Sequence, residues 1–222
     1  MLCDCLKKAI RALTEYTPAL AQEIREGEDK SDHYEDILGS YLVKLSSQKI
    51  GDSASQEAAM LLKLIGDFER ISDHSVNILE SAEEMLEKEL TFSPAAQHEI
   101  SVLTAAVHEI LDLSLQAFQT GDPEIIRSVE PLEQVIDRLK EILRTNHILR
   151  LQQGECTVTV GFVWADLLTD LERTSDHCSN IAGCLLDMQN HDMNTHAHLR
   201  ALKTSGEVFM EKLKAYSNKY AI

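Results

Sequence analysis

The strongest constraint on the fold of this chain is an internal repeat. Residues 67–78, DFERISDHSVNI, align with residues 170–181, DLERTSDHCSNI, at an offset of 103, and eight of the twelve positions are identical. An offset of 105 brings a further pair of acidic residues and a proline into register in the two halves. Self-similarity at a fixed spacing indicates that one structural unit occurs twice. The repeat therefore predicts two related units in tandem.

Each unit is predicted to consist of three helices. Apolar residues recur at steps of three and four along nearly the whole chain, which is the helical period. Pro94 and Pro123 follow the capping residues Ser93 and Asp122, an arrangement typical of a helix start. We therefore predict an all-α fold. Helices are expected at residues 2–16, 18–49, 54–90, 94–120, 123–153, 156–189 and 195–219.

This pattern divides the chain into a first unit at 1–92, a second unit at 93–190 and a C-terminal segment at 191–222. The first helix of the first unit is short, and the last helix of the chain has no counterpart in either unit. We expect the last helix to pack where the first one is short, because an amphipathic helix there would cover exposed apolar surface.

Two positions conflict with a simple helical interpretation. Pro131 lies inside the fifth expected helix, where a proline should kink the helix or split off a short first piece. Residues 157–160, TVTV, have strand propensity. The repeat nevertheless predicts that they are helical.

The charge and composition exclude several classes of protein. The chain has 37 Asp and Glu against 21 Lys and Arg, a net charge of −16, which disfavours nucleic acid and anionic lipid and favours cations or basic partners. The longest stretches without a charged residue have ten residues, whereas a membrane-spanning helix needs about twenty, so we expect no span. Five cysteines without a CxxC pattern predict a reducing compartment rather than a disulfide framework.

Paired carboxylates are the main candidate functional groups. Residues four apart on a helix are neighbours, and two like charges there destabilise an isolated helix by about 0.2–0.5 kcal/mol. A metal cation would compensate, because hard cations bind several carboxylate oxygens at once. Four Glu-x-x-x-Asp pairs occupy equivalent positions, two in each unit: Glu28 and Asp32, Glu69 and Asp73, Glu133 and Asp137, and Glu172 and Asp176. The duplicated pairs predict metal binding.

The same carboxylates also have simpler interpretations. They could form ion pairs with Arg70, Arg173 and lysine side chains, or they could simply face solvent. Beside them a polar set recurs in both units: Asp67, Arg70, His74 and Asn77, and Asp170, Arg173, His177 and Asn180. Their spacing favours ion pairs along each helix. The alternative is that this set orients the metal ligands, or that the histidines bind the metal directly.

Sequence motifs of common enzymes are missing from the chain. It has no P-loop, no glycine-rich dinucleotide loop and no G-x-S-x-G elbow. No Glu stands three residues before any His, which argues against a ferritin-like di-iron enzyme. We therefore expect a protein that binds rather than catalyses.

The duplicated E-R-x-S-D-H-x-x-N-I, preceded in each unit by a Glu-x-x-x-Asp pair on the previous helix, resembles the PhoU family of phosphate-uptake regulators. The resemblance implies two tandem antiparallel three-helix bundles, with the acidic pairs as ligands of multinuclear metal clusters. It implies iron clusters, as in some members, or otherwise zinc or another divalent cation. Carried onto this sequence, the ligands are Glu28, Asp32, Glu69, Asp73, Glu133, Asp137, Glu172 and Asp176.

The resemblance also implies a function and a partner. The expected function is a metal-binding regulatory domain in phosphate uptake, cytoplasmic and without enzyme activity, which acts on the membrane domain of a phosphate transporter in cis or in trans and can form a homodimer. Residues 209–220, FMEKLKAYSNKY, resemble the cytoplasmic end of bacterial Na/Pi cotransporters, which implies a tether to the inner face of the membrane. The rival functions are a carboxylate-metal hydrolase or oxidase and a metal-free helical adaptor.

Overall fold

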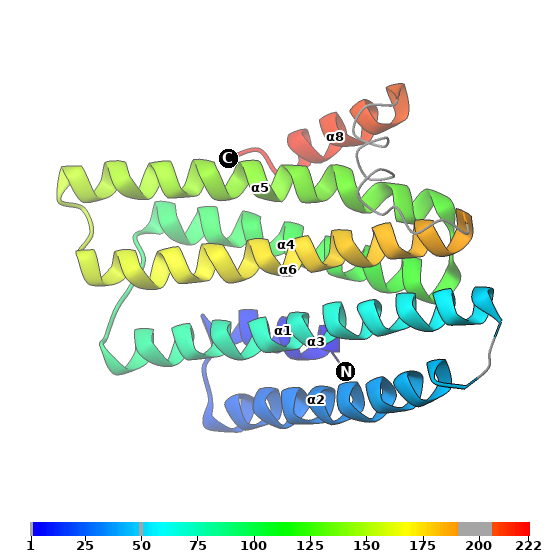
Figure 1. The fold of residues 1–222 in the computed structure, drawn as a ribbon. Helices are drawn as coiled ribbons and strands as arrows, with labels where there is room; N and C mark the ends of the chain where they lie inside the picture. The colour runs from blue at the N-terminus through cyan, green and yellow to red at the C-terminus, as the bar shows by residue number, and fades with distance from the viewer. Residues whose placement is uncertain (1, 49–50, 191–205) are drawn as a thin grey trace.

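A computed structural model describes residues 2–48, 51–190 and 206–222 (Figure 1). The described residues form seven helices and no strand, which confirms the all-α prediction. The helices are α1 (Leu2–Ala12), α2 (Pro18–Ser46), α3 (Asp52–Glu87), α4 (Pro94–Thr120), α5 (Pro123–Gln153), α6 (Val158–Asn190) and α8 (Glu207–Lys219).

The helices form two three-helix bundles that share a central interface. In Figure 1, α2, α3, α6 and α5 lie side by side in that order, with α1 behind the first pair and α4 behind the second. The interface between the bundles is formed mainly by α3 and α6, the two helices that carry the repeated motif. The motif therefore lies at the centre of the molecule.

Capping residues set the helix starts that the sequence predicts. The Thr17, Ser93 and Asp122 side chains each accept a hydrogen bond from a backbone N–H in the first turn of α2, α4 and α5, and a proline follows each of them. Gly121 and Gly154, with φ of 63° and 72°, end α4 and α5 in the left-handed conformation. The predicted bounds of these two helices, 94–120 and 123–153, agree with the structure.

The helices α1, α5 and α6 test three expectations from the sequence. The first helix ends at Ala12 rather than at residue 16, because the chain must reverse before the extended Thr17. Pro131 does not split α5, in which buried neighbours such as Val129 and Leu132 hold the helix in the core. Residues 158–160 are helical, as the repeat predicts, and the Thr157 hydroxyl accepts a hydrogen bond from the Val160 N–H at 3.3 Å.

The prediction that the last helix packs where the first helix is short is wrong for its described part. The described part, α8, lies against α5 of the second bundle rather than beside the short α1 (Figure 1). Phe209 and Leu213 are buried there, and Lys219 forms an ion pair with Glu109 of α4 at 2.9 Å. The buried apolar residues and the ion pair with α4 hold α8 on the second bundle. Residues 195–205 of the expected helix lie outside the described residues.

Among the described helices, α4 alone has the length and apolar content that a membrane span would need. Its apolar residues Leu103, Val107 and Ile110 are fully buried in the second bundle. A helix that packs into a protein core needs such apolar residues, so packing accounts for their presence in α4.

Candidate metal centres

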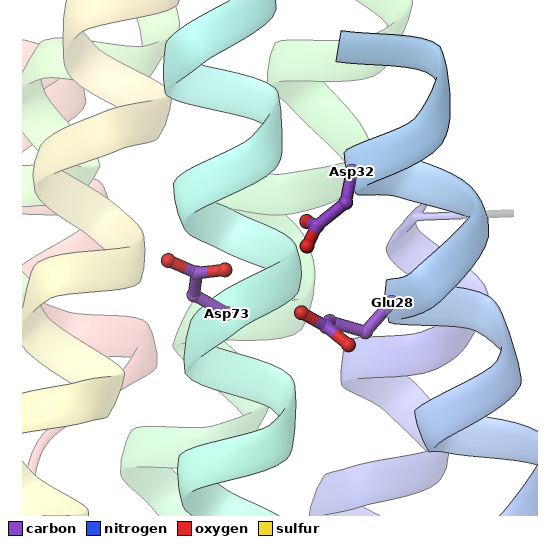
Figure 2. Close-up of side chains that lie close together, drawn as sticks. All are labelled: Glu28, Asp32 and Asp73. Atoms are coloured by element: carbon purple, nitrogen blue, oxygen red, sulfur yellow. The ribbon is translucent and has the colours of Figure 1, made fainter. Parts of the chain in front are cut away.

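The first candidate centre joins α2 to α3. Glu28 and Asp32 extend from α2 toward α3, which contributes Asp73 (Figure 2). One carboxylate oxygen of each residue lies within 4.8 Å of the corresponding oxygens of the other two. The spacing of four residues places Glu28 and Asp32 on the same face of α2, and packing of α3 against that face adds Asp73.

The second candidate centre repeats this arrangement in the other bundle. Glu133 and Asp137 of α5 and Asp176 of α6 have carboxylate oxygens that also lie within 4.8 Å of one another. It is the more enclosed of the two, since Glu133 is buried while Asp32 in the first centre is exposed. The structure therefore brings together six of the eight predicted ligands, three in each bundle.

The other two predicted ligands lie beside the centres rather than in them. Glu69 lies next to Asp73, and its Oε2 is 3.5 Å from Arg70 Nε. Glu172 forms an ion pair with Lys140 of α5, with 2.9 Å between Nζ and Oε2. Lys140 has no basic equivalent in the first bundle, because residue 35 is a glutamate at the offset of 105. The two centres consequently differ in charge.

Burial, with neighbouring negative charge, raises the pKa of three of these carboxyl groups. Burial, followed by the charge of Asp73, raises the pKa of Glu69 to about 7. Burial and the charge of Asp32 raise the pKa of Glu28, and burial and the charge of Glu172 raise the pKa of Asp176. In each case burial is the larger cause, and the charge of a neighbouring carboxylate adds to it.

The ion pairs between arginines and the acidic pairs in the described part of the chain lie at the surface. Arg70 lies 3.2 Å from Asp73, and Arg173 lies 3.4 Å from Asp176. Both arginine side chains are about 60% exposed, at 62% and 60%, so these ion pairs are screened by solvent and stabilise little. They leave the carboxylates of each cluster directed toward one another.

The donor set fits a metal cation. Protein oxygens bind hard and borderline cations at about 2.0–2.6 Å, so two oxygens on opposite sides of one ion lie about 4–5 Å apart. The three oxygens of each group all lie within 4.8 Å of one another, close enough for one ion to contact all of them. Oxygen-only ligands favour magnesium, calcium, manganese or iron over metals that need thiolate.

The repeated histidines do not join these clusters. His74 Nδ1 of α3 lies 2.9 Å from Asp170 Oδ1 of α6, and His177 Nδ1 of α6 lies 2.9 Å from Asp67 Oδ1 of α3. An ionised carboxylate only accepts hydrogen bonds, so each Nδ1 carries the proton and donates it. We call these two pairs, His74–Asp170 and His177–Asp67, the histidine clasp.

The expectation that Asp67 pairs with Arg70 along the same helix is therefore wrong. Asp67 does not pair with Arg70; it accepts hydrogen bonds from His177 and from Asn180 at 3.2 Å, both in the other bundle. The physical reason is burial: Asp67 faces the interface between α3 and α6, whereas Arg70 faces solvent. One signal was available in the sequence, because an identical polar set on two equivalent helices suits a symmetric contact between them.

Comparisons with known proteins decide the family. A family model described as the PhoU domain matches residues 1–82 and 100–185. The chain belongs to the PhoU family. It is 22% identical over 93% of its length to the phosphate-specific transport system accessory protein PhoU homolog 1 of Thermotoga maritima, covering 88% of that protein. It is 25% identical over 90% of its length to the corresponding PhoU homolog of Pseudomonas aeruginosa, covering 82% of it.

Solved PhoU structures share this fold. The crystal structure of PhoU from Pseudomonas aeruginosa matches with a TM-score of 0.78 and 22% identity, over 86% of this chain and 90% of that one. PhoU from Streptococcus pneumoniae, described as a phosphate transport system regulatory protein, matches with a TM-score of 0.73 and 18% identity, over 86% and 89% of the two chains. At this identity the likeness concerns the fold, and it agrees with the predicted pair of three-helix bundles.

Proposed function

We propose that this PhoU-family chain is a metal-binding regulator of a phosphate transport system that acts through a protein partner and has no turnover of its own. The observation that carries the proposal is the pair of equivalent three-carboxylate clusters, one in each bundle. The relatives named above as phosphate-specific transport system accessory proteins supply the process. The family resemblance makes iron the first metal to test, followed by zinc, and the all-oxygen donor set adds manganese and magnesium.

A bound cation would supply positive charge that holds α2 to α3 in one bundle and α5 to α6 in the other. Asp73 and Asp176 are the ligands contributed by the two central helices. Each is followed directly by a histidine of the clasp, which contacts the opposite central helix. Metal binding at one centre would therefore restrain the helix that carries part of the other, and this linkage gives the protein a means of regulation.

The hydrolase and oxidase alternatives require a proton-transfer group within reach of the reacting atoms. His74 and His177, the histidines adjacent in sequence to the ligands, each have Nδ1 on a buried or half-buried aspartate, an arrangement that leaves Nε2 available as a base. Phosphatase and oxidase assays of the metal-loaded protein test these alternatives, and we expect no activity above that of the Glu69→Gln/Glu172→Gln variant.

The proposed partner is the membrane component of a phosphate transporter, in the same polypeptide or in a separate one, and the proposed location is the cytoplasm. The test is phosphate uptake in cells whose own copy is replaced by Asp73→Ala/Asp176→Ala. We expect uptake to lose its response to external phosphate, as it would in a deletion strain. A Glu87→Ala/Glu155→Ala strain, which loses two exposed acids outside the clusters, should keep the response.

Two outcomes would overturn the proposal. If the variant with altered clusters regulates uptake normally while its protein level is unchanged, the clusters have no role in regulation. If the deletion strain itself regulates uptake normally, the protein acts in another process.

A further inference from the structure

A polar pocket lies beside the histidine clasp, between the C-terminal half of α3 and the N-terminal half of α6. It has a volume of about 320 Å³. No basic side chain of the described residues lines it. Its walls carry four carboxylates, a hydroxyl and an amide: Glu80, Glu84, Asp166, Asp170, Ser81 and Asn77. Unlike the two carboxylate clusters, this pocket therefore takes its oxygen atoms from both bundles.

The repeat places an equivalent set of residues at the other end of the same interface. At the offset of 103, Lys63 of α3 is the equivalent of Asp166, and Cys184 of α6 is the equivalent of Ser81. Burial raises the pKa of the Cys184 thiol to about 11, while the charge of Lys63 lowers this pKa and the charge of Asp187 raises it. The equivalent set therefore contains a cation of its own, the lysine ammonium.

The pocket has a carboxylate where the equivalent set has that ammonium. Asp166 stands at the position of Lys63, so the repeat replaces a positive charge with a negative one. Lys88 pairs with Glu84 at 2.7 Å, but its side chain is 49% exposed and it does not line the pocket. Carboxylates held this close repel one another, and a bound cation would remove the repulsion.

The Ser81 hydroxyl is an independent indication of a ligand. Ser81 is 7% exposed and lines the pocket, and its hydroxyl has no hydrogen-bond partner among the described residues. At the equivalent position, the Cys184 thiol donates a hydrogen bond to the Met60 carbonyl oxygen at 3.5 Å. A buried hydroxyl without a partner costs free energy, and its oxygen lone pairs can bind a cation.

Asp170 also has an oxygen to offer. Its Oδ1 accepts hydrogen bonds from His74 at 2.9 Å and from Asn77 at 3.1 Å. Its Oδ2 accepts none from the described residues, and the half-buried side chain lines the pocket. A cation in the pocket would therefore contact a member of the histidine clasp.

We propose that this pocket is a third cation site, for a hard divalent ion of the calcium class, with Asp166 and Asp170 of α6 and Glu80 and Ser81 of α3 as ligands. Calcium accepts about 6–8 oxygen ligands in a flexible geometry, whereas magnesium needs a near-ideal octahedron. The ion would hold α3 to α6, as the Lys63 ammonium does at the other end. Because two of its ligands are exposed, the site should exchange calcium readily during purification, unlike the clusters. The inference does not depend on the proposed function.

Terbium(III), a luminescent substitute for calcium, tests the site in Asp73→Ala/Asp176→Ala protein, which lacks ligands of both clusters. Trp164 is the only tryptophan of the chain and stands two residues before Asp166 on α6, so it can transfer excitation to terbium in the pocket. Position 176 is twelve residues from Trp164, about 18 Å along the helix, and the transfer falls steeply with distance. Excitation of the tryptophan should give saturable terbium emission, and added calcium should displace it.

A variant that copies the equivalent set locates the binding. Asp166→Lys in the same background places an ammonium at the position of Lys63, and it should lower terbium affinity at least about tenfold. Calcium should raise the melting temperature of the parent protein but not that of Asp166→Lys. Asp36→Lys, the same change of charge at an exposed position outside the pocket, should keep both responses. Circular dichroism verifies folding, and Asp166→Asn is the second variant if Asp166→Lys is not folded.

Three results would overturn the proposal. They are the absence of saturable emission, unchanged affinity in a folded Asp166 variant, and an equal loss of affinity in Asp36→Lys. The last of these would show general attraction of cations to a chain of net charge −16. The protein tested lacks ligands of both clusters, so a failure here leaves the cluster proposal standing, and a protein whose clusters bind no metal can still bind calcium in this pocket.

Discussion

At the scale of single residues, Glu69 shows how burial beside the acidic first centre changes the ionisation of a carboxyl group. Its side chain is 22% exposed, and burial together with the charge of Asp73 raises its pKa to about 7, above the usual 4.5 of a glutamate. A carboxyl group whose pKa is raised by folding stabilises the fold while it is protonated. That stabilisation is fully present below about pH 4.5 and is lost as the pH rises through about 7.

A comparison with Glu69→Gln tests this directly, because glutamine keeps the shape of a protonated glutamate. In EDTA, the free energy of unfolding of the wild type should fall relative to that of Glu69→Gln between pH 5 and pH 8. The expected change is about 1 kcal/mol, well below the full value of the pKa shift, because solvent screens this partly exposed group. Urea denaturation at both pH values measures it, with Glu87→Gln as the control. Parallel pH dependence of the wild type and Glu69→Gln would refute the account of Glu69.

At the scale of secondary-structure elements, the histidine clasp explains why α3 and α6 carry the repeated motif. The two pairs are equivalent under the repeat, and the His74 and His177 ring centroids are 5.7 Å apart. Asp67 and Asp170 each accept from one histidine and one asparagine of the other bundle. The two equivalent pairs therefore join the bundles at their centre.

A double-mutant cycle measures how strongly the clasp joins them. His74→Ala, Asp170→Ala and the double variant should give a coupling energy of about 1–2 kcal/mol, because the pair is mostly buried and hydrogen-bonded to a charge. The cycle at His177 and Asp67 should give a similar value. The exposed pair Glu84 and Lys88, 2.7 Å apart, is the control and should give about 0.3–0.5 kcal/mol. Clasp coupling no larger than this control would show that the interface depends on apolar packing alone.

At the scale of the whole molecule, the repeat and the helical period predict the two bundles, and the spacing of four residues predicts which acids share a face. These are local properties, so one sequence contains them. Three further features depend on how helices pack: the pairing of Asp67 with His177, the ion pair of Lys140 with Glu172, and the position of α8 on α5. Each joins residues far apart in the chain, and spacing along a helix carries no information about them.

We propose that each bundle binds metal at its own carboxylate cluster. The most direct test is elemental analysis of protein purified without a metal-binding tag, comparing the wild type with Asp73→Ala, Asp176→Ala and the double variant. We expect each single variant to lose the metal of one centre and the double variant to lose nearly all of its metal. Asp36→Ala, which removes an exposed acid outside both clusters, should retain the full amount. Stoichiometric metal in the folded double variant, or a wild type that takes up no metal from iron-, zinc- or manganese-supplemented medium, would contradict the account.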